Sequence, residues 1–233
     1  MKSMKISLVC MDMAGTTVAD DGLVLTAFER ALDDVGIRDE VVRRRMTDYV
    51  VATMGESKIT VFRSLLGDED EAQSANAAFE AAYSDLIEVI KPLPGAAETF
   101  ATLRSRGINT LLTTGFARST QDAILDHLGW HDAVDLSLCP ADAGGRGRPY
   151  PDMILTAILR LGIDDVRSVA VVGDTESDIT AGLAAGAPIV AGVTTGAHDR
   201  ARLLAAGATH VLDGVADVVE LLDRPQLKSI GND

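Results

Sequence analysis

One stretch near the start of the chain carries most of the fold information: Ile6-Ser7-Leu8-Val9-Cys10-Met11-Asp12-Met13-Ala14-Gly15-Thr16-Thr17, an apolar run followed by an acid. Such a run is typical of a buried strand, and an ionised carboxylate at its end is costly without a partner or ligand. Ligands of open α/β sheets bind at the carboxyl ends of the strands. The Gly-Thr-Thr turn offers backbone and hydroxyl groups that suit a phosphate or phosphonate. An Asp that only caps a turn is the alternative, because Asp and Gly are common turn residues.

Three later segments place polar residues in matching positions. The apolar run Ile108–Leu112 ends in Thr113-Thr114-Gly115, and the run Ser168–Val172 ends in Gly173-Asp174-Thr175-Glu176-Ser177-Asp178. Between them lies Gly147-Arg148-Pro149-Tyr150-Pro151-Asp152. Together with the first stretch, these segments supply a nucleophile candidate, a hydroxyl, a cation and an acidic pair, in that order.

Helices and strands are expected to alternate after Gly95. The expected helices span 96–106, 119–128, 152–161, 179–185 and 198–206, and the expected strands 108–113, 133–138, 169–172, 188–193 and 210–212. This alternation indicates parallel βαβ units. Residues 20–91 show helical periodicity without a strand, with helices near 25–35, 39–51, 57–66 and 70–90. The sequence therefore predicts an α/β protein, with a Rossmann-like core (1–18 and 95–226) and an inserted α-helical domain (19–94).

The four motifs, in this order, resemble those of the haloacid dehalogenase-like hydrolase superfamily, and the resemblance covers most of the chain. It implies a three-layer, parallel-sheet core and a helical cap domain above the active site. Composition agrees with such a core, because 47% of the residues are hydrophobic and only 4% aromatic. At 233 residues, the chain is long enough for one core and a small accessory domain.

Net charge and cysteine content limit which partners and which cellular location are expected. A net charge of −14 repels nucleic acid and anionic membranes, so neither is an expected partner. Cys10 and Cys139 lie in or beside apolar runs, which is typical of core thiols in a reduced, intracellular protein. No apolar run reaches transmembrane length, and the N-terminus lacks the form of a signal peptide. We expect a cytoplasmic protein.

The acidic residues point to a metal-assisted nucleophile. Asp12 is the expected nucleophile, because a carboxylate can attack phosphorus and form an aspartyl-phosphate that water then cleaves. Asp174 is the expected principal ligand of Mg²⁺, which prefers carboxylate, water and substrate oxygens and relieves repulsion between neighbouring carboxylates. The resemblance implies that Asp12 and the backbone carbonyl of Ala14 complete the protein ligands and that Asp178 orients a metal-bound water or the loop. The alternative for Asp174 and Asp178 is capping of the following helix.

Two loops are expected to hold the phosphorus-bearing group. Thr114 would donate a hydrogen bond to a phosphoryl oxygen, with Thr113 as the alternative. Arg148 would neutralise that group, although most of the superfamily has Lys at this place and Arg146 is the alternative. The other substrate-binding candidates in these turns are Gly15, Thr16 and Gly115.

Ala14 points to one branch of the superfamily. Its phosphatases usually carry at this place a second Asp that protonates the leaving group. The phosphonoacetaldehyde hydrolases, or phosphonatases, carry Ala, and they resemble this chain in Asp-x-Ala-Gly-Thr-Thr, Thr-Thr-Gly and Gly-Arg-Pro-Tyr-Pro. They also use a lysine within Met-Gly-x-x-Lys to form a Schiff base with an aldehyde substrate, and this chain has Met54-Gly55-Glu56-Ser57-Lys58. The resemblance implies that Lys58 is catalytic, that Met54 and Gly55 lie at the substrate, and that carbon leaves as an enamine without an acid at position 14.

The chain also departs from that branch. Met13 stands in place of a Trp, Val61 of a His and Phe116 of a Tyr, and Asp20-Asp21-Gly22 takes the place of a Cys. The absent His and Tyr would tune and shuttle protons around the Schiff base. The alternative for Lys58 is an exposed charge on a helix of the insertion, and the functional alternative is a phosphonatase-like relative with another substrate.

The leading hypothesis is a Mg²⁺-dependent hydrolase that cleaves the C–P bond of phosphonoacetaldehyde or a close relative. The alternatives are a phosphatase for small phosphate monoesters, a 2-haloacid dehalogenase, which needs no magnesium, and a metabolite sensor on an inactive core. The expected partner is a small phosphonate or phosphate. By resemblance, the cap permits a homodimer.

Overall fold

The core of the molecule is a six-stranded parallel sheet with the strand order β3-β2-β1-β4-β5-β6. This computed structural model describes residues 5–224. The strands are β1 (Leu8–Asp12), β2 (Asn109–Thr113), β3 (Leu136–Leu138), β4 (Val169–Gly173), β5 (Ile189–Val193) and β6 (His210–Leu212). β1 lies at the centre, with Asp12 in register with Thr113 of β2, and Met11 with Val172 of β4. This central place explains why every residue of β1 is buried.

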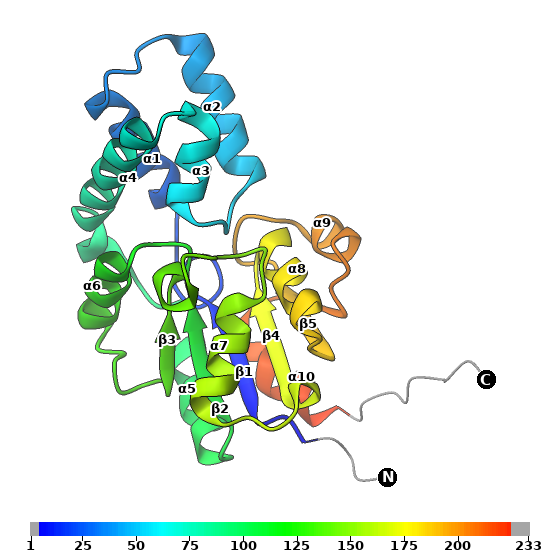
Figure 1. Ribbon diagram of the computed structural model, residues 1–233. Coiled ribbons are helices and arrows are strands. Elements are labelled where there is room, and N and C mark those ends of the chain that lie inside the picture. Colours follow the sequence, from blue (N-terminus) through cyan, green and yellow to red (C-terminus); the bar gives the residue numbers. More distant parts are fainter. Residues whose placement is uncertain (1–4, 225–233) are drawn as a thin grey trace.

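Helices cover both faces of the sheet, so the core has three layers (Figure 1). One face packs against α5 (Ala96–Ser105), α6 (Arg118–Leu128) and α10 (Val218–Asp223), and the other against α7 (Asp152–Leu161), α8 (Glu176–Ala185) and α9 (Arg200–Ala205). Short 3₁₀ helices span Ile87–Val89, Pro140–Ala143, Val166–Ser168 and Val215–Asp217. Alternate side chains of β1 serve the two faces, because Val9 and Met11 pack on the first and Leu8 and Cys10 on the second. The α/β class and its parallel sheet are as the sequence predicts.

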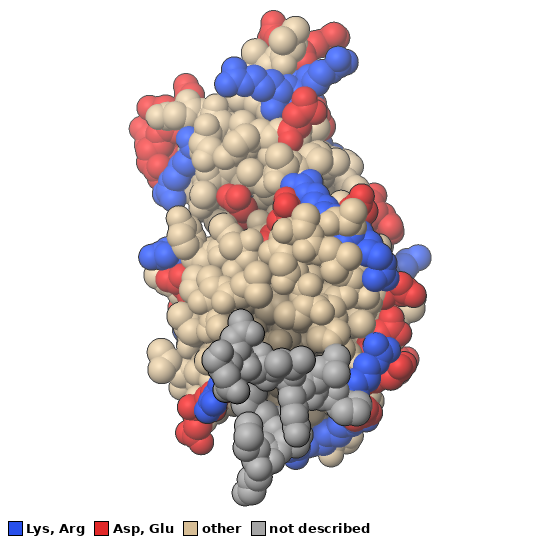
Figure 2. Space-filling model, turned by 90° about the vertical axis from the view of Figure 1, so that its right-hand side faces the viewer, with Lys and Arg blue, Asp and Glu red and all other residues tan. Residues whose placement is uncertain are grey.

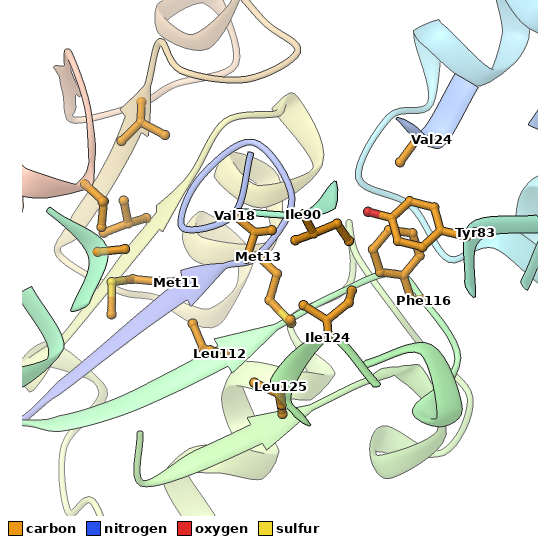
Figure 3. Close-up of a cluster of buried hydrophobic side chains, with 14 of the residues drawn as sticks. Met11, Met13, Val18, Val24, Tyr83, Ile90, Leu112, Phe116, Ile124 and Leu125 are labelled. Carbon is orange, nitrogen blue, oxygen red and sulfur yellow. The ribbon is translucent and has the colours of Figure 1, made fainter. Parts of the chain in front are cut away.

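A group of four helices, called the helical insertion below, lies between β1 and α5: α1 (Leu23–Asp34), α2 (Glu40–Ala52), α3 (Lys58–Leu66) and α4 (Glu69–Ser84). It stands beyond the carboxyl ends of the strands (Figure 1). Phe62 stacks with Phe28 and contacts Phe79 in its interior. Phe116 of the core extends this stack, with its ring centroid 4.5 Å from that of Tyr83. The apolar interior is therefore continuous from the sheet to the insertion (Figure 3).

Two elements fall short of their predicted bounds by three or more residues at one end. The helix expected to reach residue 90 ends at Ser84, because the chain then turns back to the sheet, where Ile87 and Ile90 are buried. The strand expected from residue 133 is only Leu136–Leu138. The preceding Asp135 donates its backbone N–H to the carbonyl of Thr110, and its carboxylate accepts from the backbone N–H of Thr110. A side chain thus takes the place of a backbone carbonyl there, and regular pairing with β2 begins at Leu136. Within residues 5–224, no helix is long and apolar enough to cross a bilayer.

Candidate active site

A cavity of about 400 Å³ lies between the carboxyl edge of the sheet and the helical insertion. Figure 2 shows acidic side chains in the groove between these two parts of the molecule. Of the residues expected at the site, the cavity is lined by Asp12, Ala14, Gly15, Met54, Gly55, Lys58, Thr114, Gly115, Arg148 and Asp174. The fold thus gathers residues from the first stretch, the insertion and the three later motifs into one place.

Three buried carboxylates meet at the end of the central strands. Asp12 ends β1, Asp174 follows the neighbouring β4, and Asp178 lies in the first turn of α8. One oxygen from each lies within 4.8 Å of the others. Their exposed fractions are only 5%, 2% and 2%, in the same order. Adjacent parallel strands bring their carboxyl ends together, which is why residues more than 150 positions apart in the chain share this spot.

Arg148 is the cation that faces these carboxylates. Its Nη1 donates to Oδ1 of Asp12 at 2.5 Å and to Oδ1 of Asp178. The guanidinium is buried, with 6% of the residue exposed. Arg146, the alternative from the same loop, is instead exposed, with its Nε 3.3 Å from a carboxylate oxygen of Asp152. The structure thus brings Arg148 to the site and leaves Arg146 on the surface.

When its carboxylates are ionised, this cluster carries more negative than positive charge. Burial raises the pKa of Asp12 well above its usual range, while Arg148 opposes that rise and Asp178 and Asp174 add to it. Burial, followed by the nearby charge of Asp178, raises the pKa of Asp174 to about 6. Three carboxylates face one guanidinium, so an excess of negative charge is confined in a buried place. Oxygen donors with excess negative charge fit a hard divalent cation such as Mg²⁺.

Asp174 is held rigidly by its surroundings. Its Oδ2 accepts from the backbone N–H of Ala197 at 2.7 Å, and its Oδ1 accepts from the hydroxyl of Thr16 at 3.1 Å. A Cβ at Gly196 would come within 2.0 Å of Asp174 Oδ2, and one at Gly15 within 2.5 Å. Only glycine permits this close approach of the two loops. Thr16 was expected among the substrate-binding residues, but it is fully buried and its hydroxyl is committed to Asp174.

Asp178 combines both roles that the sequence leaves open. Its Oδ2 accepts from the backbone N–H and the hydroxyl of Thr175, which completes a capping box at the start of α8. Its other oxygen, Oδ1, accepts from Arg148. Through these bonds Asp178 joins Arg148 to the start of α8, so it is suited to orient Arg148 and the loop.

The two adjacent threonines point to different sides of the sheet edge. Thr114 lines the cavity, and its Oγ1 accepts from the backbone N–H of Phe116 at 3.2 Å. The hydroxyl hydrogen of Thr114 is thus free to be donated toward a ligand. Thr113 does not line the cavity, and its hydroxyl donates to the backbone carbonyl of Met11 at 3.5 Å. Of the two, the structure brings Thr114 to the site.

Lys58 is a buried cavity residue, not an exposed charge. It begins α3, and only 7% of it is exposed. Its Nζ lies 5.7 Å from the ring centroid of Phe116, and its backbone N–H donates to the carbonyl of Gly115 at 3.2 Å. The preceding turn is pressed on the core, since a Cβ at Gly55 would come within 2.4 Å of Thr175 Oγ1. These contacts hold the first turn of α3 at the cavity that Asp12 and Asp174 also line.

The environment of Lys58 favours its neutral amine. Burial is the main cause of its lowered pKa, and the charge of Arg148 lowers it further. The carboxylates of Asp20, Asp12 and Glu80 oppose this effect. A lysine whose pKa is lowered has more of the unprotonated form that attacks carbonyl groups.

Three polar residues near Lys58 are absent from the sequence-based candidates. Asp20 lines the cavity. Glu80 of α4 accepts from the backbone N–H of Ala117 at 3.2 Å and from the hydroxyl of Thr120. The hydroxyl of Tyr83 is buried without a hydrogen-bond partner in the described chain. Only Asp20 could have been found from sequence, because Asp20-Asp21-Gly22 interrupts the family pattern; Glu80 and Tyr83 look like ordinary positions of an amphipathic helix.

Comparison with known proteins places these residues in a family. The family model of the haloacid dehalogenase-like hydrolases matches residues 6–186. The chain belongs to this family. It is therefore a hydrolase, and its motifs at Asp12, Thr114 and Arg148 lie inside the matched region, with Asp174 and Asp178 near its end.

Its relatives include proteins named phosphonoacetaldehyde hydrolase and a protein named as a probable phosphatase. The chain is 31% identical over 197 residues to a phosphonoacetaldehyde hydrolase of Bacillus cereus, covering 78% of this chain and 74% of the relative. It is 29% identical over 218 residues to the probable phosphatase IndB of Dickeya dadantii, covering 91% of each. Among solved structures, a phosphonoacetaldehyde hydrolase-like protein of Oleispira antarctica matches with a TM-score of 0.82 at 23% identity, covering 95% of this chain and 92% of that one. This structural likeness supports the fold.

Proposed function

We propose that this hydrolase cleaves the C–P bond of phosphonoacetaldehyde or a close relative, through an aspartyl-phosphate on Asp12 and a Schiff base on Lys58. The observation that supports this proposal most directly is the burial of Lys58 in the cavity that also holds Asp12. Arg148 already supplies the cation that contacts Asp12, so a phosphatase would not require a second buried cationic side chain in this cavity. Ala14 agrees with the proposal, because it leaves no acid two residues after Asp12 to protonate an ester oxygen.

The residues divide the reaction between them. The amine of Lys58 attacks the aldehyde carbon, and loss of water leaves an iminium. Asp12 attacks phosphorus, and the electrons of the C–P bond move into the iminium to form an enamine. Arg148, which contacts Asp12, offsets the charge of the phosphoryl oxygens, and Thr114 donates to one of them.

We further propose that Mg²⁺ is held by Asp12, Asp174 and the carbonyl of Ala14, with Asp178 orienting the site. When bound, it supplies positive charge that offsets the carboxylates and the phosphoryl oxygens. The support is the donor set itself: buried oxygens in negative excess, with Asp174 fixed by two hydrogen bonds.

The proposal is tested by trapping the Schiff base. Phosphonoacetaldehyde and borohydride added to the protein should give a stable mass adduct on the peptide that contains Lys58. Lys58→Arg should form no adduct and release no phosphate from phosphonoacetaldehyde. Lys91→Arg, which changes an exposed lysine outside the cavity, is the matched control and should behave as the wild-type protein does. An adduct-free wild-type protein, or full activity in Lys58→Arg, would refute the C–P mechanism.

A phosphatase is the second candidate. It is favoured by the likeness to the probable phosphatase of Dickeya dadantii and by the apolar Val61 and Phe116, where phosphonatases have His and Tyr. Phosphate release from small monoesters that is indifferent to Lys58 would establish it. A 2-haloacid dehalogenase fits poorly, because that reaction needs no acidic metal site.

The cellular setting is proposed on weaker grounds. We propose a cytoplasmic enzyme, supported by two buried, unpaired cysteines, Cys10 and Cys139. We also propose that the helical insertion acts as a cap and joins two copies into a homodimer. Exposed Val41, Val42 and Val51 on α2 support such a contact. Sedimentation of wild-type protein and of a variant with Val41→Lys and Val51→Lys tests it.

A further inference from the structure

We infer that Asp20 is the proton carrier for Lys58: its carboxylate takes a proton from the lysine ammonium and returns it to the hydroxyl that leaves during Schiff-base formation. This inference rests on the proposed function. A separate proton carrier is needed because Val61 and Phe116 are apolar and cannot exchange protons with an amine or a carbinolamine.

The position of Asp20 supports this role. It lies where the chain leaves the core for α1, and it lines the same cavity as Lys58. Its Oδ1 accepts from the backbone N–H of Val24 at 3.2 Å, which fixes the carboxylate at the start of α1. Burial is the main cause of its raised pKa, so it can hold a proton more readily than a solvated aspartate.

The charged groups around Lys58 leave Asp20 as the available carrier. Asp12 is already bonded to Arg148, and Glu80 is bonded to Ala117 and Thr120. Glu56 precedes α3, and burial raises its pKa while Lys58 lowers it, but it does not line the cavity. Among the described residues, Asp20 and the exposed Asp21 are cavity-lining carboxylates without a side-chain partner. Of these two, Asp20 is the less exposed and is the one whose charge raises the pKa of Lys58.

The protons of Schiff-base formation are balanced when Asp20 takes up one proton and then releases it. The ammonium of Lys58 gives a proton to Asp20, and the neutral amine forms a bond to the aldehyde carbon while the carbonyl pair moves to oxygen. A second proton moves from nitrogen to that oxygen, which gives the carbinolamine. Asp20 then protonates the hydroxyl, the C–O bond breaks to release water, and the nitrogen lone pair forms the iminium. Asp20 returns to its ionised form, and the net change is one ammonium and one aldehyde to one iminium and one water.

A charge effect alone predicts the opposite result from proton transfer. The carboxylate of Asp20 raises the pKa of Lys58, so its removal leaves more neutral amine near pH 7. If Asp20 acted only through its charge, Asp20→Asn would form the Schiff base as fast as the wild-type protein or faster. If Asp20 carries the proton, the same variant is slowed by about 100-fold, the lower end of the usual range for acid–base help.

The experiment measures the rate of borohydride-trapped adduct on Lys58 by rapid quench and mass spectrometry, with phosphonoacetaldehyde as the probe. Asp20→Asn keeps an oxygen for the Val24 N–H, and Asp21→Asn removes the neighbouring, exposed charge as the matched control. We expect slow adduct formation only in Asp20→Asn. Added formate should accelerate an Asp20→Ala variant by about 10-fold or more but leave Asp21→Ala unchanged, because a small carboxylate can replace a proton carrier but not a helix cap.

The outcomes separate the two proposals. Wild-type adduct with an undiminished rate in Asp20→Asn overturns the role of Asp20 and leaves the proposed function standing. No adduct in the wild-type protein refutes the proposed function, and the role of Asp20 fails with it. Slow adduct formation in Asp20→Asn without formate rescue of Asp20→Ala assigns Asp20 to the structure of α1 and also overturns the inference.

Discussion

Replacement of Gly115 by alanine should disturb the site through close contacts with the backbone that precedes α3. A Cβ at Gly115 would lie 2.4 Å from the carbonyl oxygen of Glu56, whereas ordinary contacts begin at 3.4 Å. The Cβ atom and the carbonyl oxygen are both attached directly to the backbone, so no side-chain rotation relieves the clash. The backbone at Glu56 must therefore shift by about 1 Å. Glu56 lies two residues before Lys58, whose backbone N–H donates to the Gly115 carbonyl. The shift therefore changes the position of the first turn of α3, and with it Lys58, relative to Asp12.

Two magnitudes follow from this geometry. Overpacking of this kind costs about 1–3 kcal/mol of unfolding free energy. A displacement of about 1 Å between reacting groups costs about 100-fold in turnover. Gly115 has no left-handed backbone angle, so alanine introduces no backbone strain of its own. The effect is assigned to the contacts of the new Cβ with Glu56 and with the carbonyl oxygen of Gly55, at 3.2 Å.

The assay combines phosphate release from phosphonoacetaldehyde, adduct formation on Lys58 and urea unfolding. Gly214→Ala is the matched control: its backbone is extended, with φ −171°, and its nearest contact would be an ordinary 3.4 Å to Thr195. We expect the control to resemble the wild-type protein. Wild-type turnover in a folded Gly115→Ala protein would refute the view that this contact positions Lys58.

Two further predictions concern the buried charges. Arg148→Gln should lower the free energy of unfolding in urea by about 3–5 kcal/mol, because it leaves Asp12 and Asp178 without their cation. Arg146→Gln, at an exposed arginine, should change it by less than about 0.5 kcal/mol. Equal effects of the two substitutions would contradict the buried ion pair. Without divalent metal, the free energy of unfolding should fall as the pH rises from about 4 to about 6. The reason is that folding raises the pKa of Asp174 from 3.8 to about 6, so in this range the folded state binds more protons than the unfolded state. That difference of about two pH units corresponds to at most about 3 kcal/mol. Mg²⁺ should offset the loss and raise the melting temperature. Asp174→Asn should abolish the response to Mg²⁺ and reduce the pH slope, of which the part due to the raised pKa of Asp12 remains, as calorimetry can measure. A pH slope in Asp174→Asn as steep as that of the wild-type protein would assign the slope to another group.

The order of elements and the strand-end residues could be predicted from the sequence. Apolar runs, helical periodicity and turn residues are local features, so they indicate strands, helices and their sequence order without long-range contacts. Asp12, Thr114 and Asp174 follow from the same local rule, because each stands at or just beyond the end of an expected strand, where an α/β sheet binds its ligands.

Other features depended on tertiary structure. Arg146 and Arg148 are two residues apart in one loop, yet only Arg148 is buried against Asp12, and nothing local distinguishes them. The burial of Lys58 and the approach of Asp20 depend on how the helical insertion packs on the sheet, through contacts such as that of Gly115 with Glu56. Solvation and distance between chain-remote groups set the pKa of Lys58 and Asp174, and both quantities exist only once the two parts of the chain have packed together.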